Sequence, residues 1–275
     1  MNVLPKERKV DLINGLCNGM SLRACSRVFE THRTAIQRLL VRVGERCDTL
    51  LTETMRDLDL QNLELDELWT FCGKKQARLS LAEQLNPDLG DQYLFFGIDR
   101  GTKVVPAWAL GKRDTVTALQ LLYRLRRSLN GCRPQISTDG WNGYQETIGA
   151  LFGDSVDWAT IVKEYESEHP GRGRYAPPRV SKCEKTAQLG TPDMDRVCTS
   201  IIERSNLTVR TMQRRFSRLT VAFSRKIEHL RAACALHFAY YNMVWQPRTL
   251  KGPTPAMAAG ATDRLWTVAD LVGDC

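Results

Sequence analysis

The segment Ser200–Arg218, with the sequence SIIERSNLTVRTMQRRFSR, carries the pattern on which the fold prediction depends. Read as a helix at about 100° per residue, it places Glu203, Arg210 and Arg214 within a narrow arc. The apolar residues gather on the other side: Ile202, Val209, Met212, Phe216 and Leu219. A carboxylate followed by arginines suits a site that binds both a metal ion and a phosphate group, because carboxylates bind hard cations and guanidinium groups bind phosphate oxygens. A solvated helix face fits the same pattern.

The composition is that of a cytoplasmic globular protein. The chain has 275 residues, 43% of them hydrophobic and 25% charged, which is enough to bury a full core. It contains no run of about 18 apolar residues, and its first ten residues, MNVLPKERKV, lack an apolar signal core. We therefore expect no membrane segment. The nine cysteines include no Cys-x-x-Cys pair, which argues against a disulfide framework and against a zinc site.

The charges of the chain are segregated along the sequence, and the net charge is +8. Residues 1–46 hold nine Lys and Arg against four acids, and residues 200–231 hold eight against two. Residues 51–99 reverse this balance, with ten acids against four bases. Two basic regions around an acidic one indicate a polyanionic partner and a site that concentrates carboxylates.

Residues 6–46 are predicted to form three short helices. The first spans 6–17, Ser21 caps the second, and Thr31 caps a third that begins with HRTAIQRLL. This order resembles a helix-turn-helix, whose second helix enters the major groove of DNA. Glu30-Thr31 stands in the turn where glycine is common. We expect Arg33 and Arg38 to contact DNA, and a small cap or dimerisation bundle is the alternative.

The middle of the chain alternates strands and helices. Strands are predicted at 63–71, 93–99 and 104–110, followed by a helix at 114–129, a strand ending at Thr138, a helix at 143–152 and a strand at 158–165. Residues 166–198 are predicted to be a basic loop that contacts DNA. A final helix, broken once, is predicted from about Val197 to near Trp245.

Three acidic residues occupy coordinated places in this order. Asp66 lies on the first strand, Asp139 follows the fourth, and Glu203 lies on the last helix. Taken singly, each has an ordinary reading: an edge residue, an Asx turn and a surface helix. The order of elements predicts an α/β fold with a ribonuclease H-like mixed five-stranded sheet, flanked by helices and preceded by an all-α helix-turn-helix module.

At this level the chain resembles the DDE transposases, and in particular the IS-one insertion-sequence family. The matching motifs are DELWTF at 66–71, TDGW at 138–141, IERSNLTVR at 202–210 and RRFSRLTVAFS at 214–224. A basic residue two turns after the glutamate, here Arg210, is also typical of that group. The resemblance covers roughly residues 60–245.

The resemblance implies cleavage and joining of DNA strands with two magnesium ions, for which manganese can substitute. Asp66, Asp139 and Glu203 would be the catalytic and metal-binding residues, with Asp66 bridging both ions. Arg210 and Arg214 would hold the DNA backbone. Glu67, Asn206 and His229 would either support the site or serve the fold alone.

The implied partners are double-stranded DNA, as terminal inverted repeats and as target, and further copies of the chain on that DNA. We expect a DNA-binding module at 1–50, a linker at 51–62, a catalytic domain at 63–248 and a tail at 249–275. Two other functions stay open. A ribonuclease H-like nuclease or resolvase would keep the acids without needing specific ends, and a domesticated regulator would keep only DNA binding.

Overall fold

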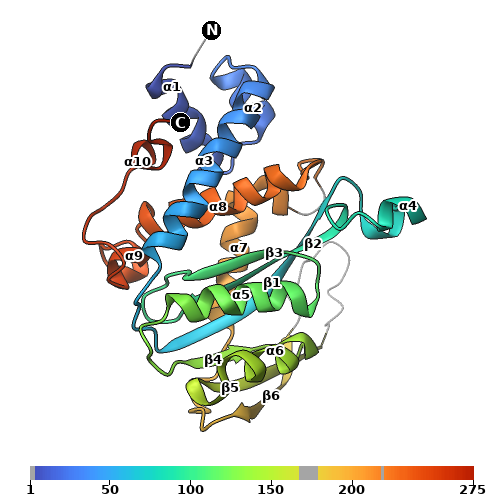
Figure 1. Ribbon diagram of the computed structural model, residues 1–275, viewed down its shortest axis with the longest axis vertical. Coiled ribbons are helices and arrows are strands. Elements are labelled where there is room, and N and C mark those ends of the chain that lie inside the picture. The colour runs from blue at the N-terminus through green and yellow to red at the C-terminus, as the bar shows by residue number, and fades with distance from the viewer. Residues whose placement is uncertain (1–3, 167–178, 218–219) are drawn as a thin grey trace.

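The computed structural model of the chain describes residues 4–166, 179–217 and 220–275 (Figure 1). A six-stranded sheet runs through its centre in the order β3-β2-β1-β4-β5-β6. The strands are β1 (Asn62–Cys72), β2 (Gly90–Asp99), β3 (Ala107–Gly111), β4 (Gln135–Thr138), β5 (Asp157–Glu166) and β6 (Arg179–Leu189). The pairs β1–β2 and β2–β3 are antiparallel, whereas β1–β4 and β4–β5 are parallel. This is the ribonuclease H-like topology, and it confirms the predicted fold class.

The sixth strand corrects the prediction of five. β6 pairs antiparallel with β5 at the edge of the sheet, and it lies inside the region 166–198 that was predicted to be a loop. Along β6 the side chains of residues 180–188 are all exposed. An edge strand with no buried face shows no alternation of apolar and polar residues, and for this reason its sequence reads as a loop. The rest of that region lies partly outside the described residues.

Helices cover both faces of the sheet. α5 (Thr115–Ser128) and α6 (Asn142–Phe152) lie on one face, and α7 (Ser200–Met212) lies behind the sheet (Figure 1). Asp114 caps α5, accepting a hydrogen bond from the Thr117 amide at 2.9 Å. Shorter elements are α4 (Leu81–Gln84), α9 (Pro255–Ala258) and α10 (Val268–Val272). No helix among the described residues is long and apolar enough to cross a membrane.

The final helix is divided once, as predicted, although the sequence did not place the break. α7 ends at Met212, a 3₁₀ turn follows at Arg214–Phe216, and α8 spans Ile227–Met243. The turn is fixed to the sheet, because Phe216 is buried and the Thr70 hydroxyl donates to the Arg215 carbonyl at 3.0 Å. Arg214 therefore leaves the helix, and the predicted stripe of three charged residues ends at Arg210.

The N-terminal helices are α1 (Lys6–Cys17), α2 (Leu22–Val28) and α3 (Arg33–Thr54). Ser21 caps α2 as predicted, but His32 takes the place expected for Thr31 at the start of α3. Thr31 instead donates its hydroxyl to the Phe29 carbonyl. In the turn, Glu30 adopts a φ of 48°, the left-handed conformation that glycine usually supplies. The turn therefore has the backbone conformation of a glycine-containing turn, although Glu30 occupies that position.

α3 is longer than predicted and packs across α8. It continues past residue 50 to Thr54, so the proposed boundary between module and linker falls inside one helix. A Cβ added to Gly44 of α3 would lie 2.5 Å from the Cβ of Ala232 on α8, so the two helix backbones cross in close contact. Buried residues of α1, α3, the sheet and α8 form one hydrophobic cluster. The division into domains stays a proposal.

Candidate active site

Asp66 is held by two hydrogen bonds in the middle of β1. Its Oδ1 accepts from the Glu67 amide at 2.8 Å, and its Oδ2 accepts from Nδ2 of Asn206 on α7 at 2.6 Å. Burial raises the pKa of Asp66 to about 6, against the lowering effect of these bonds, and the charges of Asp139 and Glu203 raise it further. A mid-strand carboxylate is therefore fixed in orientation but costly to ionise without a cation.

Asp139 follows β4 at the carboxyl end of that strand. Because β1 and β4 run parallel, this end of β4 lies beside the middle of β1. The Oδ1 atom of Asp139 accepts from the Trp141 amide at 3.0 Å, which is the Asx turn expected for an Asp-Gly pair. The turn and a ligand role are compatible, because the bond uses only one carboxylate oxygen.

Glu67 joins these two residues in a cluster of three carboxylates. One oxygen from each of Asp66, Glu67 and Asp139 lies within 4.8 Å of the others. The Glu67 side chain is only 3% exposed and pairs with Arg113 at 2.5 Å. Burial, with the charges of Asp139 and Asp66, raises the pKa of Glu67 to about 7.

This carboxylate cluster fits a divalent cation. Hard oxygen donors are what magnesium, manganese and calcium take from proteins. The Oε2 atom of Glu67 is buried without a hydrogen-bond partner among the described residues, so the cluster has an unused buried acceptor. A cation would also offset the repulsion that raises the pKa values of Asp66 and Glu67.

Glu203 faces the cluster from α7 but is not part of it. Its Oε1 accepts from Nζ of Lys163 on β5 at 2.5 Å and from the Thr199 hydroxyl at 2.8 Å. Its side chain is 47% exposed. Glu203, Lys163 and Asp139 line one open groove together with Arg113 and Trp141. The groove is thus lined by the Asp139 carboxylate and by an ion-paired glutamate.

Glu64 links β1 to the start of α7, and sequence reasoning missed it. This carboxylate is 2% exposed, and its Oε2 accepts from the amides of Ile201 and Ile202 at 2.8 and 2.9 Å. The N-cap residue Thr199 makes no side-chain cap, so Glu64 satisfies amides that the helix itself leaves free. Glu64 and Asp66 are two residues apart, so both acids lie on one face of β1. This spacing is the sequence pattern that could have identified Glu64. Glu203 follows directly after the amides that Glu64 holds.

The predicted arginines lie in two separate places. Arg210 is half-buried on α7, where its carbonyl accepts from the Ser217 hydroxyl at 3.1 Å, and Arg214 is exposed on the 3₁₀ turn. Arg33 and Arg38 are exposed on the N-terminal part of α3. Of the three residues considered for supporting roles, Asn206 and Glu67 contact the acids, whereas His229 lies half-buried on α8, where burial lowers its pKa. The DNA-contacting and catalytic roles of all these residues stay predictions.

Comparisons with known proteins agree with the resemblance that the motifs predict. The chain is 26% identical over 165 residues to the insertion element iso-IS1n protein InsB of Shigella dysenteriae, covering 60% of this chain and 84% of that protein. No protein-family model matches the chain.

Two kinds of solved structure show a limited similarity to this chain. A pre-cleavage Mos1 transpososome is 13% identical with a TM-score of 0.24 and covers 57% of this chain. A piggyBac transposase synaptic complex with hairpin DNA is 10% identical with a TM-score of 0.41 and covers the whole chain. The chain spans 60% of the Mos1 chain and 70% of the piggyBac chain. These superpositions are too poor to indicate a shared fold, which rests instead on the strand order of the sheet.

Proposed function

We propose that this chain, a relative of the insertion-element protein InsB, is a DDE transposase that cleaves and joins DNA strands at the ends of an insertion sequence. The observation that carries the proposal is the cluster of Asp66, Glu67 and Asp139 at the carboxyl end of β4, with Glu203 across the same groove. Carboxylates brought together from two strands and a helix of a ribonuclease H-like sheet are suited to phosphoryl transfer.

Asp66, Asp139 and Glu203 would hold magnesium ions, and manganese ions would serve in their place. When bound, two such ions activate the attacking water or 3′ hydroxyl and stabilise the leaving oxygen of an in-line displacement. The contacts of Glu203 with Lys163 and Thr199 both use Oε1, so its Oε2 would be the oxygen that binds a metal ion. Lys163 lines the groove, where its ammonium group can also pair with a DNA phosphate.

Residues around the acids would keep this geometry fixed. Asn206 and the Glu67 amide orient Asp66, and Glu64 holds the amides at the start of α7. Arg113 is fixed by Glu67 and lies over the Trp141 ring at 5.3 Å, so its charge is presented at the mouth of the groove. Positioned groups of this kind lower the barrier because no reorganisation is needed during the reaction.

DNA recognition would be divided between two regions. Arg33 and Arg38 on α3 would read the terminal repeats, as a recognition helix does. Arg210 and Arg214 would contact the backbone near the acids. Transposition joins two ends, so several copies of the chain would assemble on DNA, and the protein would be found there in the cell.

The test is binding and cleavage of a duplex that carries the end of the source element. The full chain should bind it more tightly than random duplex and nick it only when a divalent cation is present. Arg33→Ala or Arg38→Ala should weaken binding by about 1–3 kcal/mol if the arginine contacts guanine. Equal cleavage of terminal and random duplex would favour a nuclease or resolvase, and binding without any cleavage would favour a regulator.

A further inference from the structure

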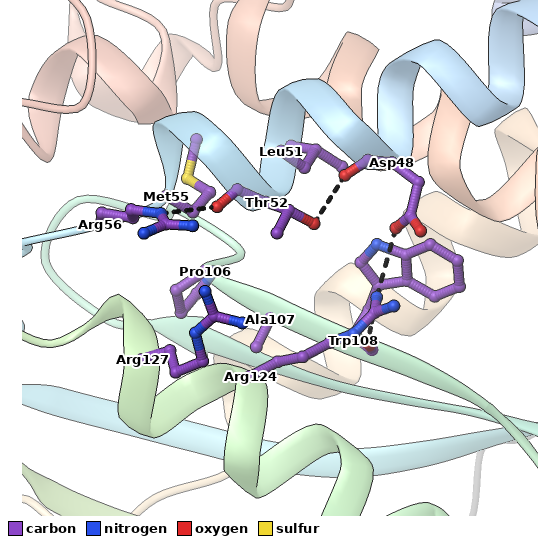
Figure 2. Close-up of a pocket in the computed structure, with 10 residues that line it drawn as sticks. All are labelled: Asp48, Leu51, Thr52, Met55, Arg56, Pro106, Ala107, Trp108, Arg124 and Arg127. Atoms are coloured by element: carbon purple, nitrogen blue, oxygen red, sulfur yellow. Dashed lines mark hydrogen bonds and ion pairs between the residues drawn. The ribbon is translucent and has the colours of Figure 1, made fainter.

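A second, smaller pocket lies where α3 meets the sheet, and it shares no lining residue with the carboxylate cluster (Figure 2). Its walls come from the last turns of α3, the start of β3 and the outer side of α5. Three arginines line it, namely Arg56, Arg124 and Arg127, together with Asp48, Thr52 and Trp108. We call these six residues the joint pocket.

Most of the positive charge of the joint pocket is not neutralised by the protein. Arg124 pairs with Asp48 at 3.2 Å and lies over the Trp108 ring at 5.3 Å. Arg56 donates to the Thr52 carbonyl at 3.0 Å, and Arg127 lies over the Tyr123 ring at 5.9 Å. Within the described ranges, neither Arg56 nor Arg127 forms an ion pair with a carboxylate. The pocket therefore carries a net charge of about +2, which suits an anion.

Trp108 supplies a second, independent feature of an anion site. The residue is 4% exposed, and its indole Nε1 is buried without a hydrogen-bond partner in the part of the chain that the structure describes. Figure 2 shows this nitrogen on the side of the ring that is turned toward the other lining residues. Indole N–H can only donate, so a buried one needs an acceptor oxygen. A phosphate oxygen in the pocket would be such an acceptor.

The position of the pocket on α3 can be compared with that of Arg38, which is expected to contact DNA. Thr52 follows Arg38 by 14 residues, which places it about 21 Å along the helix axis and about 40° around it. That separation is shorter than one turn of duplex, about 34 Å. One duplex is therefore long enough to contact both Arg38 and the pocket.

We propose that the joint pocket binds a backbone phosphate of the DNA that the protein acts on, and this inference rests on the proposed function. Arg56 and Arg127 neutralise the phosphate, and the Trp108 indole donates to one of its oxygens. Such a contact carries no sequence information and fixes the duplex relative to the sheet. It would connect the recognition helix to the catalytic half of the chain.

The experiment measures DNA binding of the full chain as a function of salt. Each phosphate contact contributes about 0.9 to the slope of log K against log salt concentration. Arg127→Gln should reduce the slope by about that amount, and should weaken binding equally for terminal and random duplex. Trp108→Phe keeps an aromatic ring but removes the indole N–H donor, so it should weaken binding with little change in slope. The matched control is Arg248→Gln, an exposed arginine outside both sites, and it should bind as the parent does.

Unchanged salt dependence in Arg127→Gln, with terminal DNA still bound by the parent, would overturn the inference and leave the proposed function standing. Absence of DNA binding by the parent would instead overturn both. A melting series with inorganic phosphate at constant ionic strength distinguishes a free anion from DNA. If phosphate stabilises the parent but Arg127→Gln keeps the parental slope, the pocket holds a free anion and not DNA. Because Arg127 is exposed, its substitution decides the question even if Trp108→Phe fails to fold.

Discussion

The carboxylates on β1 and the carboxylate on α7 are held in different ways. Asp66 and Glu67 are fixed by the strand and by burial, which raises their pKa values to about 6 and about 7. Glu203 is about half exposed and is paired with Lys163. The sheet therefore carries preassembled carboxylates, whereas the helix carries a carboxylate that is already paired with a lysine. Under the proposed function, a metal site would be built on the sheet carboxylates and completed from the helix.

The largest expected effects come from removing a carboxylate. Asp66→Asn and Asp139→Asn should each reduce cleavage of a labelled DNA end by about 10³-fold or more, because the metal site is lost. Glu203→Gln should also abolish cleavage, and combining the substitutions should add little, since members of one unit are not additive. The control is Asp263→Asn, an exposed acid near the C-terminus. Near-normal cleavage by Glu203→Gln would remove the helix from the site.

A smaller effect is expected at Glu64, which joins the two halves. Glu64→Ala leaves the Ile201 and Ile202 amides without their acceptor, so the free energy of unfolding should fall by about 1–3 kcal/mol. Cleavage should fall with it, because α7 carries Glu203. Glu64→Gln keeps an acceptor oxygen and should recover most of both, as measured by urea denaturation and the cleavage assay. If Glu64→Ala cleaves as the parent does while it is destabilised, Glu64 supports the fold and not the site.

Features that follow from the order of strands and helices could be predicted from the sequence, whereas exposed strands and contacts between distant residues could not. Asp66, Asp139 and Glu203 were singled out as candidates because they occupy defined places in the order of strands and helices, and the sheet topology confirmed that order. The strand β6 was missed because an edge strand exposed on both faces leaves no apolar pattern. The ion pair between Lys163 and Glu203 joins residues 40 apart in sequence, and no local pattern predicts such a contact.

Helix ends were the least predictable part of the fold. Three short helices were predicted within residues 6–46 and a linker at 51–62, but α3 runs on as one helix to Thr54, because its apolar face packs on α8, which the sequence does not reveal. Conversely, α7 stops before Arg214 because Phe216 is buried against the rest of the core. In both cases tertiary packing decided the end of a helix that local sequence left open.

The smallest expected effect is a change with pH in the free energy of unfolding of the metal-free protein. Carboxyl groups with raised pKa values bind protons in the folded state that the unfolded chain releases near pH 4. The free energy of unfolding should therefore fall as the pH rises from about 4 to about 7, where Glu67 titrates. Glu67→Gln should flatten this dependence in urea denaturation with EDTA present. The same slope in parent and variant would show that Glu67 does not titrate in this range.

We propose that Asp66 and Asp139 hold the metal and that Glu203 completes its binding. Isothermal titration of manganese into the metal-free chain tests it most directly, with the parent, Asp139→Asn and Glu203→Gln compared at one pH. We expect Asp139→Asn to lose measurable binding and Glu203→Gln to bind about 10–100-fold more weakly, as after loss of a supporting ligand. Parental affinity in Asp139→Asn would show that Asp139 does not hold the metal.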